Sequence, residues 1–132
     1  MASGLVTLKR RADFLRVAAV RRSAARPGLV LQAAPRPPGG DSGIVRVGFT
    51  ASRKVGNAVI RNRAKRRLRA AAAEVLGRRG RLDCDYVLIA RAGTVERGYT
   101  ELVGDIESAL RQVERRGVPA RIQPGEELHH AG

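Results

Sequence analysis

The sequence has a single cysteine, Cys84, few acidic residues and no long apolar run. One cysteine excludes an internal disulfide framework and a zinc site built from cysteines, and it fits a reducing compartment. No stretch reaches the roughly 18 consecutive apolar residues of a membrane-spanning helix. Residues 1–9 also lack the apolar segment of a signal peptide. We therefore predict a cytoplasmic protein that is neither exported nor inserted in a membrane.

Side chains that carry enzyme chemistry are also scarce. The two histidines, His129 and His130, lie in residues 117–132, a polar stretch broken by Gly and Pro that we predict to be a disordered tail. Asp83 and Asp85 precede a predicted strand, and we expect them to cap its start rather than to bind Mg²⁺. The Gly-x-x-x-x-Gly-Lys-Ser/Thr spacing of a phosphate-binding loop is missing. We predict no catalytic residue and no metal site in this chain.

Positive charge is abundant and concentrated in one stretch. The 26 Lys and Arg residues against 12 Asp and Glu give a formal charge of +14, which points to RNA or DNA as the partner. Residues 53–69 contain eight basic side chains in seventeen positions and no acid. Solvated helix faces usually mix both signs, so this one-signed stretch predicts a phosphate-binding surface.

The second half of the basic stretch has the period of a helix. Apolar residues recur every three or four positions from Ile60 to Val75 and form a stripe that can pack on a core. Asn57 can accept a hydrogen bond from the free amides of the first turn, so the helix should begin there. Gly77 is a plausible C-cap, with a basic loop over residues 78–81.

Other elements are predicted on both sides of this helix. We expect a short helix over 9–18, strands at 29–33, 44–52 and 86–90, a surface loop over 35–43 and a last helix over 99–115. In the strand 44–52, odd positions are apolar and face the core, whereas Arg46, Thr50 and Ser52 lie on the polar face. The exposed face of the last helix carries Glu101, Asp105, Glu107 and Glu114, so we expect it to face away from a nucleic acid.

The order helix, strand, strand, basic helix, strand, helix predicts an α+β sandwich with helices packed on a mixed sheet. The length of 132 residues fits one domain with one core. We assign residues 1–116 to a single RNA-binding domain and residues 117–132 to the tail.

Within the segment 46–69, Gly56-Asn57-Ala58-Val59 is followed by Arg61-Asn62-Arg63. This segment closely resembles the protein subunit of bacterial ribonuclease P, whose hallmark is an Arg-Asn-Arg helix preceded by Gly-Asn-Ala-Val. The resemblance extends to the Asp13-Phe14 helix, the strand at 86–91 and the start of the helix at 99–102. Only the two termini and the proline-rich loop lie outside it.

The resemblance implies a ribosomal-protein-like α+β fold in which the Arg-Asn-Arg helix joins parallel strands by a left-handed crossover. It also implies a subunit of ribonuclease P, which with a catalytic RNA subunit hydrolyses precursor tRNA and releases the mature 5′ end. The RNA and its Mg²⁺ ions would do the chemistry, with the metal held mainly by the RNA subunit and the RNA–protein interface. The expected partners are the RNA subunit and precursor tRNA, with no membrane and no obligate protein partner.

Residues that match the family pattern fall into two groups. Contacts to the RNA subunit and to phosphates are expected from Arg53, Lys54, Asn57, Arg61, Asn62, Arg63, Lys65, Arg66 and Arg69. A cleft between the first helix and the sheet would bind the 5′ leader through Phe14, Gln32, Arg46, Thr50, Ser52 and Arg91. Phe14 would stack on a leader base.

Two positions depart from the family pattern. Ala18 and Gln32 stand where the family often has aromatic residues. We therefore expect leader stacking to be weaker than is typical of the family, or to be replaced by hydrogen bonds from Gln32 and by arginine stacking.

Three other functions are compatible with parts of this sequence. A structural ribosomal-RNA-binding protein is the main alternative, because it shares the basic α+β character. A DNA-binding domain is less favoured because no helix–turn–helix pair precedes the basic helix. A protein-only nuclease is disfavoured by the lack of clustered acids.

Overall fold

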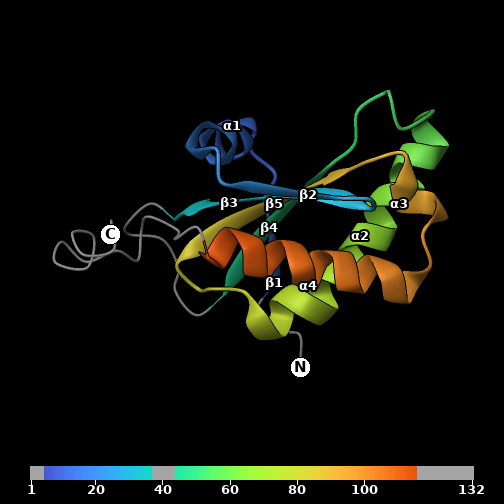
Figure 1. Cartoon of the computed structure of the whole chain (residues 1–132). Helices are drawn as coiled ribbons and strands as arrows, with labels where there is room; N and C mark the ends of the chain where they lie inside the picture. The colour runs from blue at the N-terminus through green and yellow to red at the C-terminus, as the bar shows by residue number, and fades with distance from the viewer. Residues whose placement is uncertain (1–4, 37–43, 116–132) are drawn as a thin grey trace, which may run out of the picture.

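The computed structural model describes residues 5–36 and 44–115 and consists of a mixed sheet with helices on both faces (Figure 1). The elements are β1 Leu5–Thr7, α1 Arg11–Val20, β2 Ser23–Arg26, β3 Leu29–Pro35, β4 Val45–Thr50, α2 Ala58–Arg79, β5 Cys84–Ala90, α3 Gly93–Glu96 and α4 Tyr99–Arg115. The predicted α+β class is confirmed. None of the described helices is both long enough and apolar enough to cross a membrane.

The five strands lie in the order β1-β4-β5-β3-β2. β4 is parallel to both β1 and β5, whereas β3 is antiparallel to both β5 and β2. β4 and β5 are adjacent and joined through α2, and the handedness of that crossover stays a prediction. The register places Arg46 beside Asp85 and Thr50 beside Ile89.

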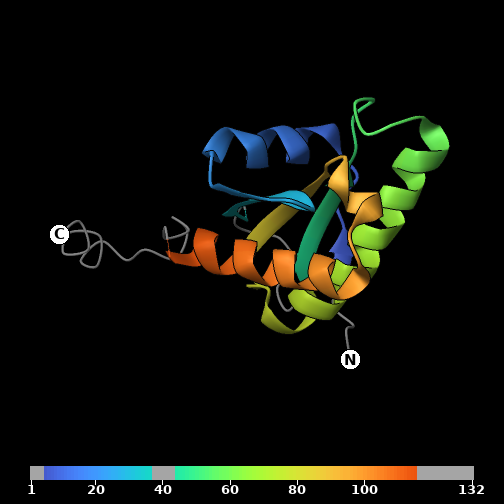
Figure 2. The same cartoon turned by 45° about the vertical axis from the view of Figure 1, so that its right-hand side comes forward.

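The helices divide between the two faces of the sheet (Figures 1 and 2). α2 and α4 cover one face, and their apolar stripes pack on the inward side chains of β3, β4 and β5 to form the main core. α1 lies alone on the opposite face, over a much smaller apolar cluster made of Leu8, Val17, Ala34 and Val87. The face of the sheet under α1 is therefore covered by less apolar packing than the face under α2 and α4.

The start of α2 agrees with the sequence prediction and its end does not. The Asn57 side chain accepts a hydrogen bond from the Ile60 amide at 2.9 Å, which caps the first turn. Ile60 itself is 37 % exposed, so the buried stripe begins one turn later at Ala64. The predicted end at Gly77 is wrong: Leu76 is buried in the core, and the helix continues to Arg79 with Gly80 as its C-cap.

The last helix is confirmed over Tyr99–Arg115, but one of its acids is not on the exposed face. Asp105 is buried, where it accepts hydrogen bonds from the Gly28 amide at 3.0 Å and from Arg97 Nε at 2.9 Å. Asp105 therefore fixes the β2–β3 turn to α4, and the prediction that it faces solvent is wrong.

Other boundaries also differ from the prediction. The strands β1 and β2 and the short helix α3 were not predicted, and Pro35 ends β3 rather than beginning a loop. Most of the predicted loop, residues 37–43, and the predicted tail, 117–132 with His129 and His130, lie outside the described residues.

Candidate RNA-binding surfaces

The first turns of α2 project beyond the sheet (Figure 2) and carry an exposed basic surface. The exposed members of the predicted set are Arg53, Lys54, Asn57, Asn62, Arg63, Arg66 and Arg69, and the half-buried ones are Arg61 and Lys65. No acid lies in the first turn of the helix. Because the free amides of that turn add a partial positive charge, this end of α2 favours an anion.

Some basic side chains of this surface have local roles. Arg61 donates from Nη1 to the Gly56 carbonyl at 3.0 Å, and the Arg69 guanidinium lies 5.3 Å from the centre of the Phe49 ring. The neighbouring Arg67 donates to the carbonyls of Thr94 and Arg97, which ties α2 to the short helix α3. None of the ion pairs within residues 5–36 and 44–115 involves Arg63 or Arg66, so these guanidiniums remain available to phosphates.

A groove lies between α1 and the sheet, with a volume of about 430 Å³. Its lining residues are Lys9, Arg11, Phe14, Ala18, Gln32, Phe49, Thr50, Val87 and Ile89. The half-buried Phe14 ring lies directly over Gly48 of β4: a Cβ added at Gly48 would stand 2.6 Å from ring atoms Cε1 and Cζ. The groove thus combines an aromatic ring and aliphatic side chains with amide, hydroxyl and basic groups.

The structure brings together half of the predicted leader-binding residues. Phe14, Gln32 and Thr50 line the groove. Ala18, which replaces the second aromatic that the family often has, also lines the groove. Ser52 and Arg91 are exposed beyond the ends of β4 and β5 and are not among the lining residues. Ser52 Oγ accepts from the Lys54 amide at 3.3 Å, and Arg91 donates from Nη1 to the Arg26 carbonyl at 2.8 Å.

Sequence reasoning missed part of the groove. Val87 and Ile89 alternate along β5 with Tyr86 and Leu88, which face the main core, so their position on the α1 face was available from the period of two. Lys9 lies just before α1 and Arg11 begins it, and the sequence predicts both only as part of a short helix. Their role in the lining depends on how α1 lies across the sheet, which no local pattern reports.

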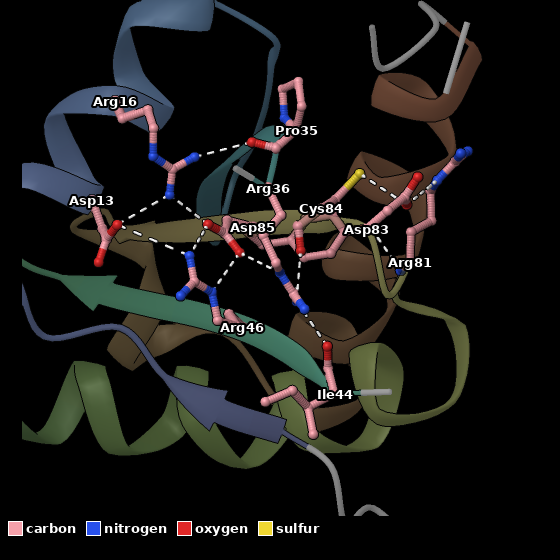
Figure 3. A network of polar contacts seen from close by, with 11 residues as sticks. Asp13, Arg16, Pro35, Arg36, Ile44, Arg46, Arg81, Asp83, Cys84 and Asp85 are labelled. Carbon is pink, nitrogen blue, oxygen red and sulfur yellow. Dashed lines mark hydrogen bonds and ion pairs between the residues drawn. The ribbon is translucent and has the colours of Figure 1, made fainter. Parts of the chain in front are cut away.

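Arg46, the remaining member of the predicted cleft, belongs to a network centred on Asp85 at the other end of the same sheet face (Figure 3). The Asp85 side chain is 0 % exposed. It accepts from Arg46 Nε at 2.8 Å, from Arg36 Nε at 3.2 Å and from Arg16 Nη2 at 2.5 Å. Asp85 is thus an ion-pair centre within β5 and does not cap the strand's start.

The network decides the ionisation of Asp85. Burial by itself would raise the pKa of this carboxyl, but the hydrogen bonds and charges of Arg46, Arg16 and Arg36 outweigh burial and lower its pKa below the ordinary value. The neighbouring Asp83 lies 3.4 Å from Arg81 Nε. Among the described residues, no group of three or more His, Cys, Asp or Glu side chains is placed to hold a metal ion.

Comparisons with known proteins agree with the resemblance. Residues 4–114 match the sequence profile of the Ribonuclease P family. The chain is 55% identical over 115 residues to the ribonuclease P protein component of Paramagnetospirillum magneticum, covering 86% of each chain. It is 50% identical over 113 residues to that of Ruegeria pomeroyi, covering 85% of this chain and 89% of the relative.

Solved structures agree with the fold. The ribonuclease P protein of Staphylococcus aureus is 28% identical and superposes with a TM-score of 0.64, covering 80% of this chain and 92% of that one. The Thermotoga maritima protein, at 24% identity and a TM-score of 0.63, shares the fold over 77% of this chain and 92% of its own. The chain therefore belongs to the ribonuclease P protein family and is a protein component of the endoribonuclease that processes the 5′ ends of tRNA.

Proposed function

We propose that this component uses two surfaces: the basic start of α2 binds the RNA subunit, and the groove under α1 binds the 5′ leader of precursor tRNA. The observation that carries the proposal is the groove, where Phe14, Gln32 and Thr50 meet on the face of the sheet opposite α2. Leader binding and assembly with the RNA subunit would then depend on different side chains. A substitution in one surface can therefore be tested for its effect on the function of the other surface.

The lining of the groove suits a single-stranded nucleic acid. Aromatic rings bind unpaired bases by stacking, which contributes about 1–3 kcal/mol per base and tolerates any sequence. Phe14, Val87 and Ile89 provide apolar surface, and Gln32 and Thr50 provide hydrogen-bonding groups. Lys9 and Arg11 supply charge for the backbone phosphates at the start of α1.

The basic start of α2 suits a folded RNA. Its like charges repel one another at i,i+4 pairs such as Arg61 and Lys65, by a few tenths of a kcal/mol each, and a polyanion removes that cost. Exposed guanidiniums such as Arg63 and Arg66 can donate two parallel hydrogen bonds to one phosphate. The contribution of this surface to assembly should therefore fall as salt is raised.

We assign the hydrolytic chemistry to the RNA subunit. The described residues do not offer a fitting set of metal ligands, because their most buried carboxylate, Asp85, is already neutralised by arginines. Mg²⁺ would be held mainly by the RNA subunit and the RNA–protein interface. The protein would supply counter-charge and leader binding.

The test measures cleavage of a precursor tRNA by a bacterial ribonuclease P RNA, with and without this protein, at low and at high Mg²⁺. Strong stimulation at low Mg²⁺ that fades as Mg²⁺ is raised is the expected result. Absence of stimulation, together with tight binding to other structured RNAs, would favour a structural ribosomal-RNA-binding protein instead.

The groove is tested with a matched pair of variants on α1. Phe14→Ala should weaken binding of leader-bearing precursor by about 5-fold to 150-fold, the equivalent of one lost stack. Leu15→Ala changes the neighbouring side chain, which is 56% exposed and outside the groove lining, and should leave binding unchanged. The leader-binding assignment fails if Phe14→Ala has no effect while binding still depends on the leader.

A further inference from the structure

α1 has little apolar packing with which to hold its position. Val17 is its only fully buried side chain, whereas α2 and α4 each bury six residues. The cluster beneath α1 is small: its buried members are Leu8, Val17, Ala34 and Val87, and the partly buried Phe14, Val20 and Ile89 pack against them. Polar contacts from α1 to the sheet therefore add to a small apolar contact.

The shortest polar contact of α1 to the sheet is the ion pair between Arg16 and Asp85, at 2.5 Å (Figure 3). Arg16 also donates from Nη1 to the Pro35 carbonyl at 3.0 Å and from Nη2 to Asp13 at 3.1 Å. One guanidinium thus joins α1 to β5 and to the end of β3. Asp13, the residue before Phe14, lies in addition 4.0 Å from Arg46 of β4.

Asp85 is the point at which these contacts meet. Its two carboxylate oxygens accept from Arg16 of α1, Arg36 after β3 and Arg46 of β4, so four segments converge on one buried charge. A buried carboxylate is stable only while its partners remain in place, and each partner is equally constrained by it. The groove residues Phe14 and Ala18 lie on the helix that this network holds.

We propose that Asp85 is a positioning residue for leader binding: through Arg16 it sets where α1 lies, and so where the Phe14 ring stands over Gly48. This inference rests on the proposed role of the groove. Asp85 does not line the groove and would not touch RNA. Its effect on leader affinity is indirect, because a ring displaced with its helix stacks less well.

The test compares two buried carboxylates on opposite faces of the sheet. Asp85→Asn removes the charge from the network under α1, and Asp105→Asn removes the charge paired with Arg97 under α4. Holoenzyme is reconstituted with the RNA subunit, and affinity is measured for precursor tRNA with and without a leader, beside the melting temperature of each variant.

Both substitutions should lower the melting temperature, but only Asp85→Asn should reduce the affinity gained from the leader, by roughly tenfold, within the range of one stack. The inference is overturned if the affinity gained from the leader is the same in Asp85→Asn and Asp105→Asn, because Asp85 would then have only a structural role. If Asp85→Asn does not fold, Arg16→Met provides the second variant, since it cuts only the link from α1 and leaves Arg36 and Arg46 on Asp85.

A double-mutant cycle with Phe14→Ala tests whether the effect passes through the ring. Adding Arg16→Met to Phe14→Ala should cost little further leader affinity, because the ring that Arg16 positions is already absent. Fully additive losses would mean that Arg16 acts elsewhere, and would overturn the inference. If Phe14→Ala alone has no effect, the groove assignment itself has failed; if Phe14→Ala weakens binding and the network variants do not, only the positioning role is wrong.

Salt dependence separates positioning from direct contact. Arg16 and Arg46 are 29% and 25% exposed, so a leader phosphate could reach them. A direct contact would lower the slope of log affinity against log salt by about 0.7 when Arg16 is replaced. An unchanged slope with reduced affinity is the expected result, and a reduced slope would make Arg16 a leader ligand rather than a positioning residue.

Discussion

Replacing Gly48 by alanine should displace the Phe14 ring from the sheet. A Cβ at this position would stand 2.6 Å from Cε1 and Cζ of Phe14 and 3.3 Å from Cβ of Leu8. Carbon atoms in ordinary contact are about 3.5–4.0 Å apart, so the ring must move by roughly 1 Å. Alanine suits a strand better than glycine does, so the effect of the change falls on the contact with the ring.

Urea unfolding and precursor binding together show whether the added methyl group strains the core or displaces the Phe14 ring. If the ring stays in place, overpacking should cost about 1–3 kcal/mol of stability, visible as a lower midpoint in urea unfolding. If the ring swings out, stability changes less, and the loss appears as weaker binding of leader-bearing precursor, by up to about 3 kcal/mol. Gly104→Ala is the matched control, because Gly104 lies in α4 with nothing within 4 Å of an added Cβ. This change should raise the free energy of unfolding by up to about 1 kcal/mol.

The reasoning would be refuted by a Gly48→Ala protein with unchanged stability and unchanged leader affinity in assays where Phe14→Ala is impaired. In that case the ring does not rest on Gly48. The double variant Gly48→Ala/Phe14→Ala provides a second check. Its stability should be no lower than that of Phe14→Ala, because the added methyl group then has room.

Further predictions concern α2 and β5. Arg63→Ala should weaken assembly with the RNA subunit by about 1.5–3 kcal/mol if its guanidinium binds a phosphate, and a change of a few tenths in a filter-binding titration would assign it to solvent. Asn57→Ala should cost about 1 kcal/mol in urea unfolding through loss of the helix cap, whereas Asn57→Asp should retain most of the stability. Folding lowers the pKa of Asp85, so the ionised carboxylate contributes fully to the free energy of unfolding above about pH 4, and this contribution is lost as the pH falls further. The stability deficit of Asp85→Asn should therefore be smaller at pH 3 than at pH 7. An equal deficit at both pH values would contradict this. Burial raises the pKa of the Cys84 thiol to about 12, so native protein at pH 8 should react with a thiol reagent only on unfolding, and rapid native labelling would show the thiol to be accessible.

The elements that the sequence predicted best are those whose pattern repeats over several turns or residues. The stripe of α4 and the alternation of β4 carry their own signal, since each buries one face against the main core. β1 and β2 have no such signal: β1 is three residues long and is defined by parallel pairing with β4, and β2 is an edge strand of small and basic residues. Such strands form because of their partners and not because of local preference.

The predictability of the site residues likewise depends on whether their signal is local. Phe14, Gln32 and Thr50 were placed in the cleft by resemblance, and the polar-face alternation of β4 supported Thr50 from the residues themselves. Asp85 could not be interpreted in this way, because its arginine partners are up to 69 residues away in the chain. A buried charge is defined by side chains that the fold brings together, so its role emerges only from three-dimensional structure.

The position of β5 has a consequence for biosynthesis. β5 lies between β4 and β3, so the sheet cannot close until residue 90 has been translated. The cationic helix α2 is made before that strand, and thus leaves the ribosome while the surface that buries its apolar side is still incomplete. The main core also includes α4, so the apolar side of α2 is covered only after the last described helix has been made.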